Sequence, residues 1–180
     1  MQRLRLNIVC PDKPGLIAAI TGALFELDVN FSDTHFALLE THGEFSAICE
    51  APDSLDAQNM HDLLVALAPL ANAKIDIMPF RAAKTAVDSN ITHWFYLEGA
   101  DQPGLVARLT EVFGDYEANI LQMDTRRLHA NGGEHSQDAL YWIEVGVQID
   151  AARSDACVAT VENTAALLNM QISVFAEDVF

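Results

Sequence analysis

The sequence predicts an α+β protein made of two copies of one small unit, each with the order β-α-β-β-α-β. Three observations indicate this fold class. A turn of the form Asp-x-Pro-Gly occurs at 12–15 and again at 101–104. Alternating apolar residues precede each turn, and apolar residues at helical spacing follow it. Farther along each half, two alternating segments separated by turn residues are typical of a hairpin.

The two turns mark an internal duplication. Asp12 and Asp101 stand 89 residues apart, and with this offset segments 12–31 and 101–120 align without a gap. Seven of the twenty aligned positions are identical. In the first copy these are Asp12, Pro14, Gly15, Leu16, Ala18, Thr21 and Asn30. A repeat of this kind indicates two structural units of the same fold.

The first copy contains one complete set of elements. In chain order we predict a strand at 4–9, the turn at 12–15, a helix, hairpin strands at 30–39 and 44–50, a second helix and a strand at 74–78. The apolar stripe of the first helix consists of Leu16, Ile17, Ile20, Leu24 and Leu27. Pro52, Asp53 and Ser54 are expected to cap the second helix. The apolar face of that helix consists of Leu55, Met60, Leu63, Leu64, Leu67 and Leu70.

The second copy repeats this order. We predict a strand at 93–98, a helix with the stripe Leu105, Val106, Leu109, Val112, Phe113 and Tyr116, hairpin strands at 119–128 and 139–148, a helix at 151–168 and a strand at 170–175. This is the ferredoxin-like order, in which two helices pack on one face of a four-stranded antiparallel sheet. The expected domains are therefore 1–80 and 93–180, joined by a polar linker at 81–92.

The composition favours a folded protein that does not bind nucleic acid or anionic membranes. The 180 residues are 51% hydrophobic and 20% charged, which predicts a buried core rather than disorder. The formal net charge of −16 repels phosphate groups, so we expect no direct binding to nucleic acid and none to anionic membranes. A basic protein partner is compatible with this charge, and so is a simple role in solubility.

The sequence has none of the features of a secreted or membrane protein. It contains no apolar run of the roughly 18–20 residues that a membrane span needs. Residues 1–6 predict a strand and lack the features of a signal peptide, so we expect a cytoplasmic protein. The three cysteines, Cys10, Cys49 and Cys157, are widely spaced. We expect them to be buried thiols rather than a disulfide framework or a metal site.

The Asp-x-Pro-Gly turn has the chemistry of an anion site. Pro14 suits the start of a helix, Asp12 can cap it, and Gly15 allows close approach to its backbone. The N–H groups of residues 15–17 have no partners within the helix, so they can bind a carboxylate. Asn30 opens the next strand, at the sheet end that we expect to lie nearest the turn. A purely structural role for these four residues explains the same pattern.

Given these turns, their place between strand and helix, and the βαββαβ order, the chain resembles a tandem ACT-domain protein over both halves. The resemblance implies a small-amino-acid sensor that binds its ligand where two domains meet. Carried onto this sequence, the ligand-binding positions are Asp12, Lys13, Pro14, Gly15, Leu16 and Asn30 in the first copy, and Asp101, Gln102, Pro103, Gly104, Leu105 and Asn119 in the second.

One departure from the family pattern separates the two copies. The family turn is often Asp-Arg-Pro-Gly, but here Lys13 and Gln102 occupy the second position. Only the first turn therefore keeps a cation beside the anion site. We expect the two sites to be unequal, with the second one degenerate.

Within the family, a stand-alone pair of this length resembles the repressors of glycine-cleavage genes. That implies transcriptional regulation in response to a small amino acid, glycine being the first candidate, through a basic DNA-binding transcription factor. Two alternatives stay open, a ligand-independent interaction scaffold and a sensor of another small amino acid. A homodimer is also compatible with exposed sheet edges.

Catalytic and metal motifs are absent from the sequence. There is no phosphate-binding loop, no nucleophile elbow and no His-Glu-x-x-His pattern, so we expect neither an enzyme nor a cofactor. The polar insertion at 129–138 is interpreted as a mobile loop or a contact loop rather than a metal site. Trp94 and Trp142 fall in predicted strands, where we interpret them as packing residues rather than a stacking platform.

Overall fold

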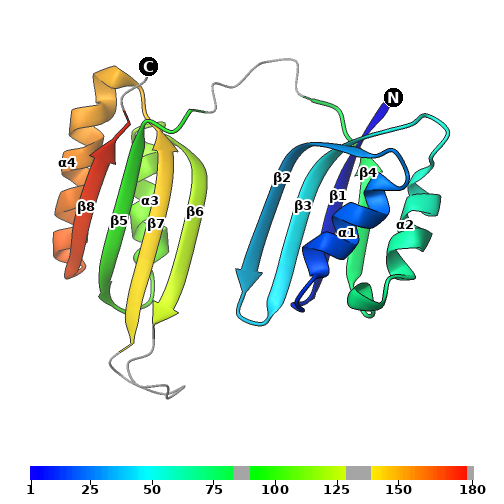
Figure 1. Cartoon of the computed structure of the whole chain (residues 1–180). Helices are drawn as coiled ribbons and strands as arrows, with labels where there is room; N and C mark the ends of the chain where they lie inside the picture. Colours follow the sequence, from blue (N-terminus) through cyan, green and yellow to red (C-terminus); the bar gives the residue numbers. More distant parts are fainter. Residues whose placement is uncertain (83–89, 129–138, 178–180) are drawn as a thin grey trace. The chain divides into compact units, whose positions relative to one another are not determined.

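The computed structural model describes residues 1–82, 90–128 and 139–177, so the insertion at 129–138 and most of the predicted linker lie outside the described residues. The chain divides into two compact units, Met1–Thr85 and Ala86–Phe180 (Figure 1). Each unit has its own sheet, its own pair of helices and its own core. Among the described residues, no helix is long and apolar enough to cross a membrane.

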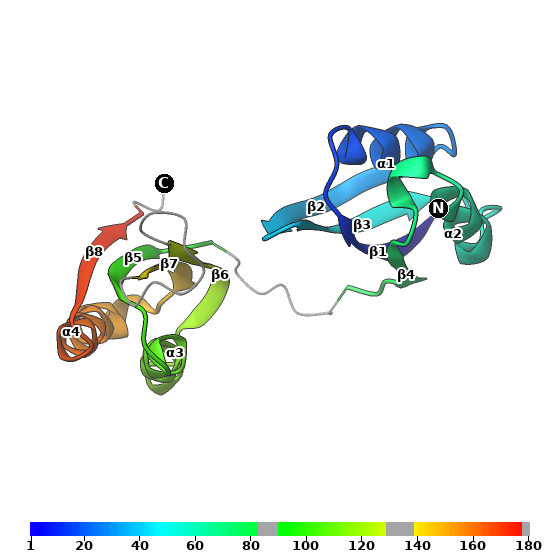
Figure 2. The same ribbon diagram turned by 90° about the horizontal axis from the view of Figure 1, so that it is seen from below.

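The first unit is one βαββαβ module. Its elements are β1 (Gln2–Pro11), α1 (Leu16–Phe25), β2 (Asn30–Leu39), β3 (His42–Ala51), α2 (Ala57–Val65), the short 3₁₀ helix η1 (Ala68–Leu70) and β4 (Lys74–Pro79). The strands form an antiparallel sheet in the order β2-β3-β1-β4, which leaves β2 and β4 at its edges. Both helices lie on the same face of the sheet (Figure 2).

The second unit has the same plan. Its elements are β5 (His93–Ala100), α3 (Leu105–Asp115), β6 (Asn119–Leu128), β7 (Leu140–Gln148), α4 (Ala151–Leu167) and β8 (Met170–Ala176). The sheet order is β6-β7-β5-β8, and α3 and α4 lie together on one face (Figure 2). The predicted fold class, two ferredoxin-like units each with a four-stranded antiparallel sheet and two helices on one face, is confirmed.

Alternation along the strands builds each core. In β1, Leu4, Leu6 and Ile8 are no more than 1% exposed, and the residues between them face away from the helices. The helix stripe meets these side chains, since Leu16, Ile20 and Leu24 are also buried. Burial of each such side chain stabilises the fold by roughly 1.5–3 kcal/mol. The predicted apolar faces therefore form the cores.

The expected cap of the second helix was placed too early. Pro52 accepts a hydrogen bond from the Leu55 N–H at 3.0 Å, so residues 52–55 form a separate turn. Asp56 is the true cap, and its carboxylate accepts the Asn59 N–H at 2.7 Å. Several capping residues stood in a row, and only the geometry of that preceding turn decides which one begins the helix.

Two glycines of α1 make a matched pair for testing the turn. Gly15 has a φ of 83° and Gly22 lies inside the helix, and a Cβ on either residue would meet nothing within 4 Å. Gly15→Ala should lower the free energy of unfolding by about 1–2 kcal/mol because an L-residue is strained at positive φ. Gly22→Ala should raise it by about 1 kcal/mol. Urea unfolding of both variants would measure these changes, and equal signs would contradict this account.

His93 provides a pH-dependent contribution to stability. Thr92 Oγ1 donates its one proton to the Val147 carbonyl, so His93 Nδ1 donates to Thr92 Oγ1 and Nε2 accepts from Ser154 Oγ, each at 3.0 Å. Burial lowers the pKa of His93, and Asp155 opposes this only in part. Neutral His93 therefore stabilises the fold at neutral pH. The stability is lost as the pH falls below about 6.5, where the unfolded state binds the proton first.

Urea unfolding at pH 7.5 and pH 5.5 tests this assignment. Wild type should lose more free energy of unfolding on acidification than His93→Gln, whose amide has no titrating nitrogen. An equal loss in both proteins would show that the imidazole does not titrate differently on folding.

Candidate functional site

The first Asp-x-Pro-Gly sequence forms a type II β-turn. Leu16 N–H donates to the Lys13 carbonyl at 3.1 Å, and Gly15 adopts φ 83° and ψ 3°. The third residue of this turn type must have a positive φ, which explains the glycine, and proline is favoured just before it. Pro14 therefore belongs to the turn rather than to the first turn of α1. The Asp12 N–H anchors the turn to the following hairpin by donating to the Thr41 carbonyl at 2.9 Å.

The turn leaves fewer free donors than the sequence suggested. The Leu16 N–H is already used within the turn, and Gly15 is the N-cap of α1. The N–H groups of Gly15 and Ile17 have no backbone acceptor in the part of the chain that the structure describes. No side chain caps α1, so the predicted capping role of Asp12 is wrong. The N-cap of α1 is Gly15, three residues after Asp12.

The second turn repeats the left-handed glycine of the first, but its side chains are engaged. Gly104 has a φ of 91°, and the Asp101 N–H donates to the Ala139 carbonyl at 3.0 Å. The Asp101 carboxylate, 22% exposed, forms an ion pair with Arg127 of β6. Gln102 Nε2 donates to the Leu168 carbonyl at 2.7 Å. Both polar side chains of this turn are therefore held by their own unit.

The first turn lacks these internal partners. Leu38 stands where the second unit has Arg127, each being the next-to-last residue of its strand. Asp12 and Lys13 are exposed, and neither forms a salt bridge within 1–82, 90–128 and 139–177. Among the described residues, this turn therefore combines an exposed cation, Lys13, with N–H groups that lack a backbone acceptor. The two turns thus differ in their side-chain partners. Arg127 engages Asp101 in the second turn, and Gln102 there replaces the cation Lys13.

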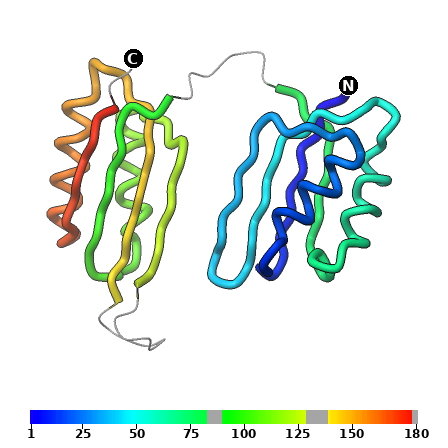
Figure 3. The backbone as a smooth tube through the Cα atoms, viewed as in Figure 1, coloured from blue at the N-terminus to red at the C-terminus, as the bar shows by residue number. Residues whose placement is uncertain are grey.

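The two asparagines do not lie beside the turns. Asn30 pairs with Glu50, which also pairs with Arg3 at the start of β1, whereas the turn follows the end of β1 (Figure 3). Asn119 likewise lies at the sheet end opposite the second turn, in the row of Gln148. At about 3.3 Å per residue, roughly 25 Å separates Asn30 from the turn of its own unit. The expectation that they share one sheet end is therefore wrong.

An apolar edge beside the first turn escaped sequence reasoning. Phe36 and Leu38 of β2 are 40% and 54% exposed, and both lie on the helix side of the sheet opposite Phe45 and Gly43. The ring of Phe36 and the side chain of Leu16 sit within 2.9 and 3.2 Å of where a Gly43 Cβ would be. The signal was present as two apolar residues at alternate positions of an edge strand.

Other kinds of site receive no support. Among the described residues, no group of three or more His, Cys, Asp or Glu side chains could hold a metal ion. The three cysteines are free and buried, as predicted. Burial raises the pKa of each thiol, that of Cys49 to about 11, so none is an activated nucleophile.

Comparison with known proteins agrees with the duplicated fold. No family profile matches the chain. The glycine cleavage system transcriptional repressors of Escherichia coli K12 and Shigella flexneri are each 26% identical over 129 residues. The match covers 70% of this chain but only 65% of either repressor's length. In sequence the chain is therefore similar to these repressors over most of its length.

Solved structures extend the match over both units of the fold. A protein of unknown function from Galdieria sulphuraria superposes with a TM-score of 0.77 at 18% identity and covers 98% of this chain and 99% of its own. A structure provisionally named as a glycine cleavage system transcriptional repressor gives a TM-score of 0.67 at 14% identity, with 98% of both chains covered. At these identities the two matches establish the tandem fold.

Proposed function

We propose that this protein is a tandem ACT-domain, amino-acid-responsive regulator of glycine-cleavage genes. The observation that carries the proposal is the first turn, where Lys13 and two open N–H groups stand at an exposed surface. The sequence similarity to glycine cleavage repressors supports the same conclusion. The ligand is a small amino acid, with glycine the first candidate.

The carboxylate of the ligand would bind at the first turn. The N-terminal end of α1 carries a partial positive charge, and the Lys13 ammonium adds a full one. Phe36 and Leu38 bound the same surface with apolar side chains, which favours a small ligand without a charged side chain. The second turn offers less to an anion, because Asp101 and Gln102 already have partners.

The asparagines take part only if two units combine. Roughly 25 Å is too far for one amino acid to touch both Asn30 and its own turn. A complete site would therefore use the turn of one copy of the chain and the asparagine of a second copy in a homodimer. Such a site would form only when two copies meet, so the ligand would have different affinities for the single and the paired chain.

Regulation would pass to DNA through a second protein. The net charge of −16 disfavours direct contact with a phosphate backbone. A basic DNA-binding transcription factor would meet this surface with favourable electrostatics. The amount of such a factor retained by the immobilised protein should change when the amino acid is added. If no amino acid changed that amount, the protein would be a ligand-independent scaffold.

Calorimetry with a panel of amino acids tests the ligand. Wild type should bind one small amino acid, and Lys13→Gln should weaken that binding about fivefold, because a charge-assisted contact contributes about 1 kcal/mol. Lys74→Gln, which removes an exposed cation of β4, should leave the affinity unchanged. Asn30→Ala should also weaken binding while leaving the fold intact. If wild type bound none of the amino acids in the panel, amino-acid sensing would be refuted.

The inequality of the two turns has its own test. The double variant Arg127→Leu with Gln102→Lys gives the second turn the side chains found at the first, and it frees the Asp101 carboxylate. Its calorimetric stoichiometry should rise from one ligand per chain to two. Arg108→Leu, which changes an exposed arginine of α3, should keep the wild-type stoichiometry. Two ligands bound by wild type would contradict the inequality.

A further inference from the structure

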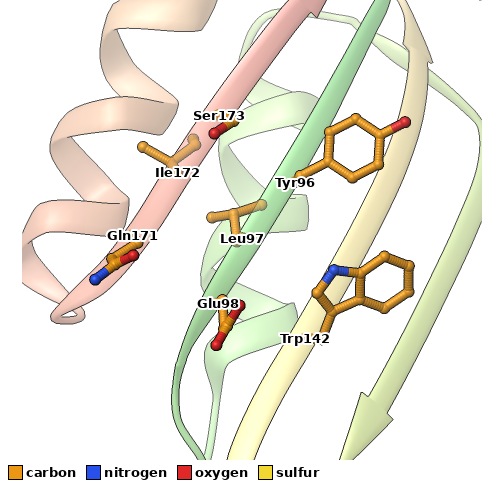
Figure 4. Close-up of a pocket in the computed structure, with 7 residues that line it drawn as sticks. All are labelled: Tyr96, Leu97, Glu98, Trp142, Gln171, Ile172 and Ser173. Atoms are coloured by element: carbon orange, nitrogen blue, oxygen red, sulfur yellow. The ribbon is translucent and has the colours of Figure 1, made fainter.

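Four aromatic side chains gather on the outward face of the second sheet, the face opposite α3 and α4. Trp94 pairs with Phe175 and Glu98 with Trp142, so these residues and Tyr96 project from the same side of three adjacent strands. Figure 4 shows the rings of Tyr96 and Trp142 on β5 and β7. Trp94 is a packing residue, as expected, because its ring lies over Gly146, but it packs on the outward face. Trp94 and Trp142 are both half-buried and lie outside the core.

Three of the four rings contact one another, and Trp142 lines the same depression as Tyr96. Trp94 stacks on Tyr96 with centroids 6.3 Å apart, and Tyr96 meets Phe175 edge-on at 5.6 Å. Phe175 is 58% exposed. The guanidinium of Arg126 lies over the ring of Trp142, 5.8 Å from its centroid. This part of the sheet thus already accepts a guanidinium on an aromatic ring.

Carboxylates surround the same rings. Glu177 accepts a hydrogen bond from Trp94 Nε1 at 2.8 Å, and Glu98 and Glu144 project from β5 and β7 on the same side. Partial burial raises the pKa of Tyr96, and the charges of Glu144 and Glu177 raise it further. Three carboxylates therefore lie around the rings, against the one guanidinium of Arg126.

The fold itself does not require this chemistry. With the offset of 89 residues, Arg5 and Asn7 of β1 occupy the positions of Trp94 and Tyr96. Glu44 pairs with Val9 as Trp142 pairs with Glu98, and Met78 pairs with Arg5 as Phe175 pairs with Trp94. The first unit reaches the same sheet topology without an aromatic residue at any of these four positions. The topology therefore does not explain the cluster, although the Trp94 ring also fills the space over Gly146.

We propose that this surface, named the aromatic face and consisting of Trp94, Tyr96, Trp142 and Phe175 with Glu98, Glu144 and Glu177, docks an arginine-bearing basic segment of a partner protein. The guanidinium groups would stack on the rings and pair with the carboxylates, as Arg126 does in part. The face goes beyond the proposed function, because its docking requires no amino-acid ligand.

Size and charge favour a peptide over other occupants. The depression lined by Tyr96, Glu98, Trp142, Gln171 and Ser173 holds about 130 Å³, which is below the roughly 300–1,000 Å³ of small-molecule sites but suits a single side chain. Aromatic platforms also bind single-stranded nucleic acid, but there they are combined with positive grooves. Here carboxylates lie around the aromatic side chains, and they repel phosphate and attract guanidinium.

The chain carries its own reporter for this interaction, because its two tryptophans are both in the aromatic face. Titration with a short peptide of alternating arginine and serine should change the tryptophan emission to saturation. The same peptide with citrulline in place of arginine, equal in shape but uncharged, should not. Phe175→Ala, at an exposed position that the core does not need, should weaken binding about tenfold.

Matched carboxylate variants separate docking from general charge attraction. Glu98→Gln with Glu144→Gln should weaken peptide binding about tenfold. Glu44→Gln with Glu50→Gln, which removes the same charge from the outward face of the first unit, should leave it unchanged. Circular dichroism of each variant checks the fold, and calorimetry with the amino-acid panel reports separately on the first turn.

Three results would overturn the proposal. Equal weakening by both carboxylate pairs would mean attraction to net charge alone. An emission change that depends on protein concentration without peptide, with a dimer in sedimentation, would mean that a second copy covers the face. Tighter binding of a single-stranded oligonucleotide than of the arginine peptide would assign the rings to nucleic acid instead.

Discussion

The positive φ of one glycine in each unit is the constraint on which the rest of the molecule depends. At Gly15 and Gly104 the chain leaves a core strand and must enter a helix that runs back over the same sheet. A type II turn makes this reversal within four residues, and only glycine adopts its third position without strain. Because the turn is short, it places the first buried helix residue, Leu16 or Leu105, directly against the sheet. The helix stripe and the alternating strands can then form one core.

The two units share this framework and differ in how their surfaces are used. The first unit leaves Asp12 and Lys13 without internal salt bridges among the described residues, while the second ties Asp101 to Arg127 and Gln102 to Leu168. The outward faces of the two sheets also differ, because only the second unit carries the aromatic cluster. Duplication has therefore produced two copies with one core plan and two surface chemistries. That division is consistent with one unit that holds the ligand and another that docks the partner.

The separation of turn and asparagine also shapes how such a protein would respond. A single unit presents its turn at one end of its sheet and its asparagine about 25 Å away at the other. A ligand held by the turn of one copy of the chain and the asparagine of a second copy would favour the paired state, and that preference is what allows binding at one place to alter binding at another.

The sequence by itself determined the duplication, the element order, the core stripes and the need for glycine at the two turns, because these depend on short-range periodicity and local backbone sterics. It misplaced the Asp56 cap and Asn30, and it did not reveal Arg127 as the partner of Asp101 or the sheet face on which the two tryptophans lie. Those features depend on which sheet end a strand starts from, which face the helices cover, and which side chains meet across the strand order β6-β7-β5-β8. Only the tertiary structure decides them, since each involves residues that are brought together by the sheet rather than by the chain.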